Sequence, residues 1–327
     1  MKLSVKCMFA ATLLAGGILF TAAVSSNPGQ EFITHTVAKG ETVSLLCIDY
    51  YGHYSSEMGN AFKEINPSVQ NINLIHVGQK LKFANPDYKP QAKKSPSPLF
   101  EKKVSITQAV VTYVEGDARL ISGSHKEKLT SNTIVNPGAI IETASNGRVE
   151  MIINKESVVR IKENTRTTLG TIRDKKKNKG TTEMNFTIGS VWTKVKKFKD
   201  KISRFQLELP TAIAGVHGTV YQATVDNDSS AEVKVYDGEV SVKNNPKTAA
   251  LSPTEGFHEV SGPEEVSAPH EVSLSEWSQI IRSMQKIDID KEGHPGKPES
   301  FSRASDDDWE QWNEKRDKRI AKMFMEI

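Results

Sequence analysis

The apolar residues of this chain repeat with two different periods, and this change constrains the fold more than any other feature. Over residues 149–235 they alternate with polar residues, which indicates strands with one buried face. The alternating groups are Val149, Met151 and Ile153; Val159 and Ile161; Phe205, Leu207 and Leu209; Val233 and Val235. Turn signals separate them at Asn136-Pro137-Gly138, Asn146-Gly147 and Asp237-Gly238. The sequence therefore predicts an all-β domain over residues 104–245, either a sandwich or a roll.

Nearer the N-terminus, the period is helical. Apolar side chains three or four residues apart share one face of each of two predicted helices. They are Val43, Leu46, Cys47 and Tyr50, and then Met58, Ala61, Phe62 and Ile65. A short strand begins at His35 and another covers residues 79–83. Residues 33–84 are thus predicted to form a small βααβ module, and the whole chain belongs to the α+β class.

The first 25 residues have the pattern of a cleaved secretory signal. Lys2 and Lys6 precede an apolar run at residues 8–20, and small residues follow it. The alternative is a retained membrane anchor, but the run is shorter than the roughly 20 apolar residues that a spanning helix needs. We expect a periplasmic or secreted, wall-associated protein with no membrane span after cleavage. Cys47 is then the only cysteine of the mature chain, so packing must stabilise the fold without an internal disulfide.

Two further segments differ in composition from the predicted domains. Residues 85–103 contain four prolines and indicate a semi-extended linker. Residues 264–327 form an acidic tail, predicted to be helical over residues 273–287 and again from Ser305. The first helix would bury Leu274, Trp277, Ile281 and Met284, and the second Trp309, Trp312, Ile320, Met323, Phe324 and Ile327.

The charge distribution predicts where this tail docks. Residues 101–250 carry 24 Lys and Arg against 17 Asp and Glu, whereas residues 251–327 carry 10 against 17. Opposite charges favour packing of the tail on the β domain, close to the basic run at residues 173–179. The other reading of that run is a solvated hairpin loop.

The N-terminal module resembles a LysM domain. The resemblance rests on the patterns T-V-x-x-G-E-T-V, I-N-P and L-I-x-V-G-Q-K-L, which span nearly the whole module. It implies a shallow groove that binds N-acetylglucosamine-containing glycan such as peptidoglycan. The groove residues would be Gly40, Glu41, Thr42 and Val43 on one side and Asn71, Ile72, Asn73, Leu74 and Ile75 on the other. The alternative from the residues alone is that these are ordinary turn positions.

The β domain resembles FecR-type domains. The core pattern is P-T-A-x-A-x-V-x-G-T, followed by V-x-V-Y-D-G-x-V-x-V, and it includes Pro210, Thr211, Ala212, Gly215, His217, Gly218 and Thr219. His217 occupies the position where the family usually has arginine. We expect the small residues to allow close approach of neighbouring strands rather than to line a catalytic pocket.

The sequence contains no recognisable catalytic or cofactor motif. The patterns GxSxG, HExxH and CxxC are absent, and we expect no enzyme activity, cofactor or nucleic-acid partner. Residues 288–299 resemble a calcium loop, but two prolines interrupt the position where its helix should begin. The predicted function is a non-catalytic envelope protein that binds peptidoglycan and presents its β domain to an unidentified protein partner or as a sensor.

Two alternatives to that function remain open. FecR-type domains occur in regulators that control sigma factors across the inner membrane. Such a role would require a cytoplasmic N-terminal domain and a spanning helix, and we recognise neither in the sequence. The second alternative is a peptidoglycan hydrolase targeted by its LysM-like domain, which would need catalytic residues.

Overall fold

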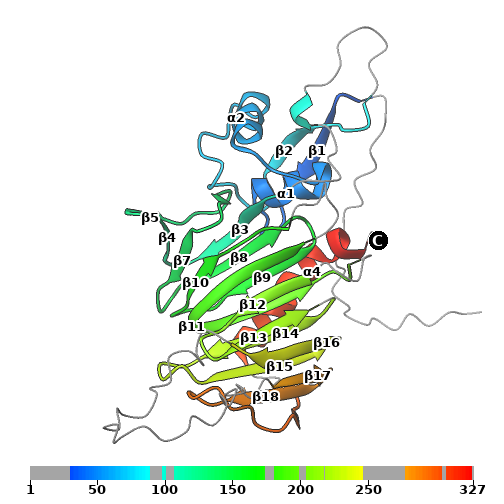
Figure 1. Ribbon diagram of the computed structural model, residues 1–327. Helices are drawn as coiled ribbons and strands as arrows, with labels where there is room; N and C mark the ends of the chain where they lie inside the picture. The colour runs from blue at the N-terminus through cyan, green and yellow to red at the C-terminus, as the bar shows by residue number, and fades with distance from the viewer. Residues whose placement is uncertain are drawn as a thin grey trace, which may run out of the picture.

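A computed structural model describes residues 30–88, 98–100, 107–173, 180–198, 204–216, 218–245, 277–303 and 307–325. The N-terminal module has two antiparallel strands and two helices (Figure 1). In chain order they are β1 (Phe32–Thr36), α1 (Val43–Tyr51), α2 (Ser56–Ile65) and β2 (Lys80–Ala84). This is the order of elements that the hydrophobic period predicts.

Local sequence signals set the ends of both helices. The hydroxyls of Thr42 and Ser55 accept hydrogen bonds from first-turn amides of α1 and α2. Gly52 ends α1 with a φ of 80°, a left-handed conformation that glycine adopts readily. The helices pack on the strands through a core that contains Cys47, Tyr51, Met58, Phe62, Leu81 and Phe83. Cys47 is therefore a small core residue, as its position on the helical face predicts.

The β domain consists of two sheets that share one long strand. Sheet I has the order β6-β3-β8-β9-β11-β14-β15-β18-β19, and all its pairs are antiparallel. Its strands are β3 (Ala109–Glu115), β6 (Ile134–Val135), β8 (Arg148–Ile153), β9 (Ser157–Ile161), β11 (Thr181–Val195), β14 (Val220–Val225), β15 (Ala231–Asp237), β18 (Gln285–Ile289) and β19 (Glu299–Ser300).

Sheet II has the order β5-β4-β7-β10-β11-β12-β13-β16-β17. Besides β11, its strands are β4 (Ala118–Ser122), β5 (His125–Lys128), β7 (Ile140–Thr143), β10 (Arg166–Leu169), β12 (Arg204–Glu208), β13 (Ala212–Val216), β16 (Glu239–Asn244) and β17 (Ser278–Arg282). The β11–β12 pair is parallel, and the other pairs of this sheet are antiparallel.

Strand β11 passes from one sheet to the other at Gly189. Ile188 still pairs with β10 in sheet II, whereas Gly189 begins the pairing with β14 in sheet I. Gly189 has a φ of 102°, and a Cβ at this position would lie 2.2 Å from Oγ1 of Thr165. The inner faces of both sheets bury one continuous apolar core. The curled sheet in Figure 1 thus agrees with the predicted sandwich or roll.

Helix α4 (Asp308–Met325) crosses the outer face of sheet I, behind the strands in Figure 1. Trp309 is 1% exposed, Asp317 pairs with Lys194 at 3.2 Å, and the Tyr236 hydroxyl donates to Glu310 at 2.7 Å. The predicted terminal helix is present and lies on the β domain. Residues 174–179 lie outside the described residues, so the docking close to the basic run stays a prediction. The predicted contacts of Met323, Phe324 and Ile327 lie outside the described residues.

The predicted helix over residues 273–287 is wrong. Residues 278–289 form the hairpin of β17 and β18, which pair with β16 and β15. Met284 lies in its turn with a φ of 61°, so a helix cannot continue through it. Ile281 and Ile287 enter the shared core, and tertiary packing therefore overrides the helical spacing. The tail is thus not uniformly helical, and its residues 278–289 belong to the β domain.

The predicted linker is partly incorporated into the module. Residues 98–100 form a short 3₁₀ helix, η1 (Pro98–Phe100), and Phe100 packs on Tyr51 with ring centres 5.3 Å apart. The rest of the linker, apart from residues 85–88 and 98–100, and the predicted signal at residues 1–25 lie outside the described residues. Among the described helices, none is both long and apolar enough to cross a membrane.

The module docks directly on sheet I. Val110 of β3, Ile152 of β8 and Val158 of β9 share one apolar cluster with the module's core. Their neighbours Val111, Ile153 and Val159 point to the opposite face, into the core between the sheets. These strands are therefore buried on both faces, and the module is packed against the β domain rather than held away from it.

Candidate functional site

The first loop of the predicted groove is held by Glu41. Its carboxylate accepts a hydrogen bond from the Ala38 amide at 2.7 Å and lies 2.7 Å from Nε2 of His35. Burial opposes ionisation, but the bonds to His35 and Ala38 and the nearby Arg319 hold the pKa of Glu41 below its usual range. Gly40 precedes it with a φ of 80°. This loop presents its backbone toward α4 and the β domain.

The second loop of the predicted groove is largely exposed. Leu74 is 64% exposed, and Asn71 and Asn73 are also exposed, whereas Ile72 and Ile75 are half-buried. The Asn71 carboxamide accepts from the Asn73 amide at 2.9 Å and fixes the turn. One side of the predicted groove is therefore accessible to a ligand.

The β domain inserts Asn132 between the two loops. Its Oδ1 accepts from the Ser44 amide at 2.7 Å, and its Nδ2 donates to Oδ1 of Asn73 at 2.6 Å and to the Ile72 carbonyl at 3.4 Å. Asn132 lies in a turn with a φ of 69°, which asparagine tolerates better than most residues. A single carboxamide thus bridges both sides of the predicted groove.

Strand β3 also contacts the first loop of the predicted groove and the start of α1. The Thr42 hydroxyl donates to the Thr112 carbonyl at 2.6 Å, and the Ser44 hydroxyl to the Val111 carbonyl at 3.3 Å. Thr42 is 9% exposed and Val43 is fully buried. Thr42 and Val43, two of the nine predicted glycan-binding residues, are therefore covered by other parts of the chain.

Helix α4 closes the same site from the other side. Arg316 donates to the Gly40 carbonyl at 2.7 Å, and Arg319 donates to Glu41 at 3.1 Å and to the Lys39 carbonyl at 2.7 Å. A Cβ on Gly40 would lie 2.7 Å from Nη1 of Arg316, so this glycine also leaves room for the guanidinium.

A buried ion cluster anchors Arg316. Glu150 is fully buried and lies 2.9 Å from Nε of Arg160 and 2.5 Å from Nη2 of Arg316. Desolvation opposes its charge, but the two guanidinium groups lower the pKa of Glu150 to about 2. Arg316 therefore connects the β domain, α4 and the module.

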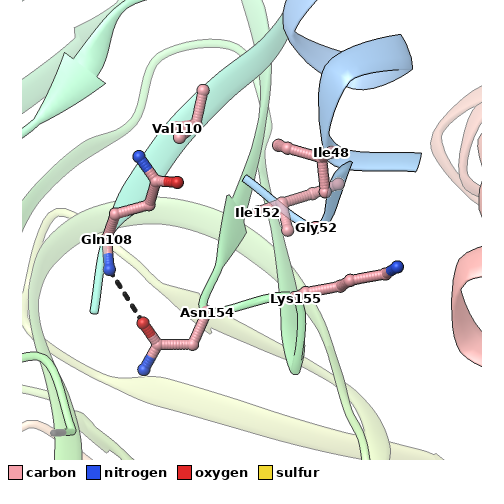
Figure 2. A pocket seen from close by; sticks show the side chains of 7 residues that line it. All are labelled: Ile48, Gly52, Gln108, Val110, Ile152, Asn154 and Lys155. Carbon is pink, nitrogen blue, oxygen red and sulfur yellow. Dashed lines mark hydrogen bonds between the residues drawn. The ribbon is translucent and has the colours of Figure 1, made fainter. Parts of the chain in front are cut away.

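A small cleft lies between α1 and the ends of β3 and β8 (Figure 2). Its volume is about 10 Å³, and its lining residues are Ile48, Gly52, Gln108, Val110, Ile152, Asn154 and Lys155. Gln108 donates its backbone amide to Asn154 at 2.9 Å, as Figure 2 shows. Small-molecule sites usually occupy about 300 Å³ or more, so this cleft is too small for a substrate. It holds at most one water molecule.

The residues of the FecR-type pattern form a corner between strands. The Thr211 carbonyl accepts from Asn245 at 3.3 Å, and the Thr219 hydroxyl donates to the Glu239 carbonyl at 2.8 Å. Pro210 lies in the turn between β12 and β13, Ala212 is buried in β13, and His217 lies outside the described residues.

Only one of the two glycines in this corner allows a close approach. Gly218 has a φ of 113°, and a Cβ there would lie 2.7 Å from Cα of Lys197. At Gly215 the nearest atom would be 3.9 Å away, so the expected close approach is wrong at this position. The described part of the corner connects strands β12, β13 and β14.

Two other sequence features have structural roles where they are described. Arg173 is 4% exposed and pairs with Glu156 at 2.5 Å, so the basic run does not begin as a solvated loop. In the calcium-like segment, Asp290 accepts from the amides of Glu292 and His294 at 3.0 and 2.8 Å. The described residues contain no group of three or more His, Cys, Asp or Glu placed to hold a metal ion.

Sequence reasoning did not identify Asn132, Arg316 or Arg319. Asn132 is 88 residues from Ser44, and Arg316 is 276 residues from Gly40, so no local pattern connects them. The sequence does contain a pattern that indicates the surface of sheet I on which the module docks. The apolar pairs at residues 110–111, 152–153 and 158–159 interrupt strict alternation, which is typical of strands buried on both faces.

Comparison with known proteins identifies part of the chain. The family described as FecR protein matches residues 139–241, from just before β7 into β16. A FecR domain therefore occupies this region, as its sequence pattern indicates, within the longer predicted domain of residues 104–245. No curated protein matches the chain.

Two crystal structures of a candidate anti-sigma factor from Parabacteroides distasonis are similar to this chain. Both align with a TM-score of 0.34, at 14% and 13% identity. Each alignment covers 50% of this chain and 60% of the other chain. The LysM resemblance of residues 33–84 stays a prediction.

Proposed function

We propose that this chain is a non-enzymatic regulator of the bacterial cell envelope. Its FecR domain would act through protein contacts, and its N-terminal module would bind N-acetylglucosamine-containing glycan of peptidoglycan. The family match at residues 139–241 supports the regulatory role better than a role in peptidoglycan binding alone. The LysM-like sequence of the module is the support for the glycan ligand.

The interface between the module and the β domain carries this proposal. The groove residue Thr42 donates to the Thr112 carbonyl of β3, in the sheet that also contains part of the FecR domain. Ile72 and Asn73 accept from Asn132, in the turn before β6. A change at the first loop can reach the FecR domain through Arg316, which donates to the Gly40 carbonyl and pairs with Glu150 of β8. The two parts are suited to couple ligand binding to a protein response.

The chemistry of the described residues favours binding over catalysis. Cys47 is buried, and burial raises the pKa of its thiol, which makes it a poor nucleophile at neutral pH. His35, Glu41 and Tyr50 form a hydrogen-bonded series, but Glu41 also holds Arg319 and the loop backbone. We therefore assign these groups a structural role. The proposed location, in the periplasm or at the cell wall, rests on the secretory-signal pattern of the first 25 residues.

A transcription experiment tests the regulatory role. In the bacterium that encodes the chain, we expect fragments of murein sacculi to change the transcription of envelope genes. Leu74→Asp places a charge on the exposed side of the groove and should abolish this response. Ile280→Asp is the matched control, because Ile280 is 49% exposed on β17. An unchanged response in cells that lack the chain would contradict the proposal.

A further inference from the structure

The side chain of Asn132 has the same hydrogen-bonding groups as an N-acetyl substituent on a sugar. Both contain a carbonyl that accepts and an N–H that donates, attached to one planar amide. In this chain, the side-chain carbonyl of Asn132 accepts a hydrogen bond from the Ser44 amide. The side-chain NH₂ group of Asn132 donates to Oδ1 of Asn73 and to the Ile72 carbonyl.

The Ser44 amide is a donor that needs an outside partner. Thr42 is the N-cap of α1, and Ser44 therefore lies in the first turn, where backbone amides have no acceptor within the helix. The Leu45 amide is already bonded to the Thr42 hydroxyl at 3.3 Å. An acetamido carbonyl in the groove would compete with Asn132 for the Ser44 amide.

We propose that Asn132 is a built-in competitor of the glycan and keeps the module closed on the β domain. This inference rests on the proposed function, since it concerns the regulation of the same groove. Glycan binding displaces the Asn132 side chain from the Ser44 amide and weakens the docking of the module. By reciprocity, docking lowers the affinity for glycan by the same factor.

Contacts from α4 also stabilise the closed state, in which the module is docked on the β domain. Arg316 and Arg319 donate to backbone carbonyls of the first loop, and Thr42 donates to the Thr112 carbonyl. A bound glycan does not replace these contacts. The closed chain therefore binds glycan weakly, and a change that removes the side-chain acceptor of Asn132 raises the affinity.

Binding of full-length mature chains to N-acetylchitohexaose, measured by calorimetry, and cosedimentation with murein sacculi test this proposal. Asn132→Gly removes the carboxamide and keeps the left-handed backbone accessible. We expect its affinity to exceed that of the wild type by about tenfold, since the three hydrogen bonds that the Asn132 side chain makes in the closed state are lost. Asn164→Gly is the matched control, because Asn164 is an exposed turn residue with a φ of 55°.

A second variant covers the case in which Asn132→Gly does not fold. Asn132→Asp keeps the acceptor of the Ser44 amide and makes it a carboxylate at the N-terminus of α1, so it should hold that amide more tightly and lower the affinity for glycan. Equal affinities in the wild type, Asn132→Gly and Asn132→Asp, with retained binding, would overturn the competition and leave the glycan ligand in place. Absence of binding in every chain would overturn the glycan part of the proposed function, and the competition with it.

Discussion

Glu150 balances the charges between sheet I and α4. It is fully buried between Arg160 and Arg316, and its carboxylate also accepts from the Thr112 hydroxyl at 2.9 Å. Removing one partner of a buried ion cluster leaves the other charges without compensation, which costs more than an exposed pair contributes. The change in stability on substitution of Glu150 thus measures the contact between sheet I and α4.

We expect Glu150→Gln to lower the free energy of unfolding at pH 7 by about 3–5 kcal/mol, measured by urea denaturation. Glu127→Gln is the control, since Glu127 is 52% exposed and its pair with His125 contributes little. The pKa of Glu150 is lowered from 4.5 to about 2, so its stabilisation is present above pH 4.5 and is lost as the pH falls toward 2. The gap between wild type and variant should close over this range. A gap that is constant from pH 7 to pH 2 would contradict the account.

The elements differ in how far their sequence predicts them. Strands with one buried face, such as β12 and β15, and the helices of the module follow their hydrophobic periods. The β17–β18 hairpin does not, because Trp277, Ile281 and Met284 happen to have helical spacing while their strands pair with distant parts of the chain. Non-local pairing of this kind is invisible to a local pattern.

Trp309 is the largest buried side chain by which α4 docks on sheet I. Trp309 is 1% exposed and stacks on Trp312 with ring centres 5.2 Å apart. We expect Trp309→Ala to cost about 3–5 kcal/mol, because it leaves a cavity beneath the helix. Glu314→Ala on the exposed side of α4 serves as the control. Similar thermal unfolding of both variants would show that the helix is not held as described.

For the whole molecule, sequence patterns predicted the parts better than their arrangement. The βααβ module, the β domain and the terminal helix follow from period and resemblance. The contact between Asn132 and the groove could not be predicted, since it depends on how two separately folded regions meet. The sequence predicted a semi-extended linker between the module and the β domain. In the structure, Phe100 and the apolar residues on the outer face of sheet I share one core with the module.

Amide hydrogen exchange at Ser44 in the intact chain tests the closed arrangement most directly. Its N–H has no acceptor within α1, so protection reports the bond to Asn132. We predict slow exchange in the wild type and in Asn164→Gly, and exchange at least about tenfold faster in Asn132→Gly. Fast exchange at Ser44 in the wild type, with the rest of α1 protected, would show that the module is not closed on the β domain and would contradict the account.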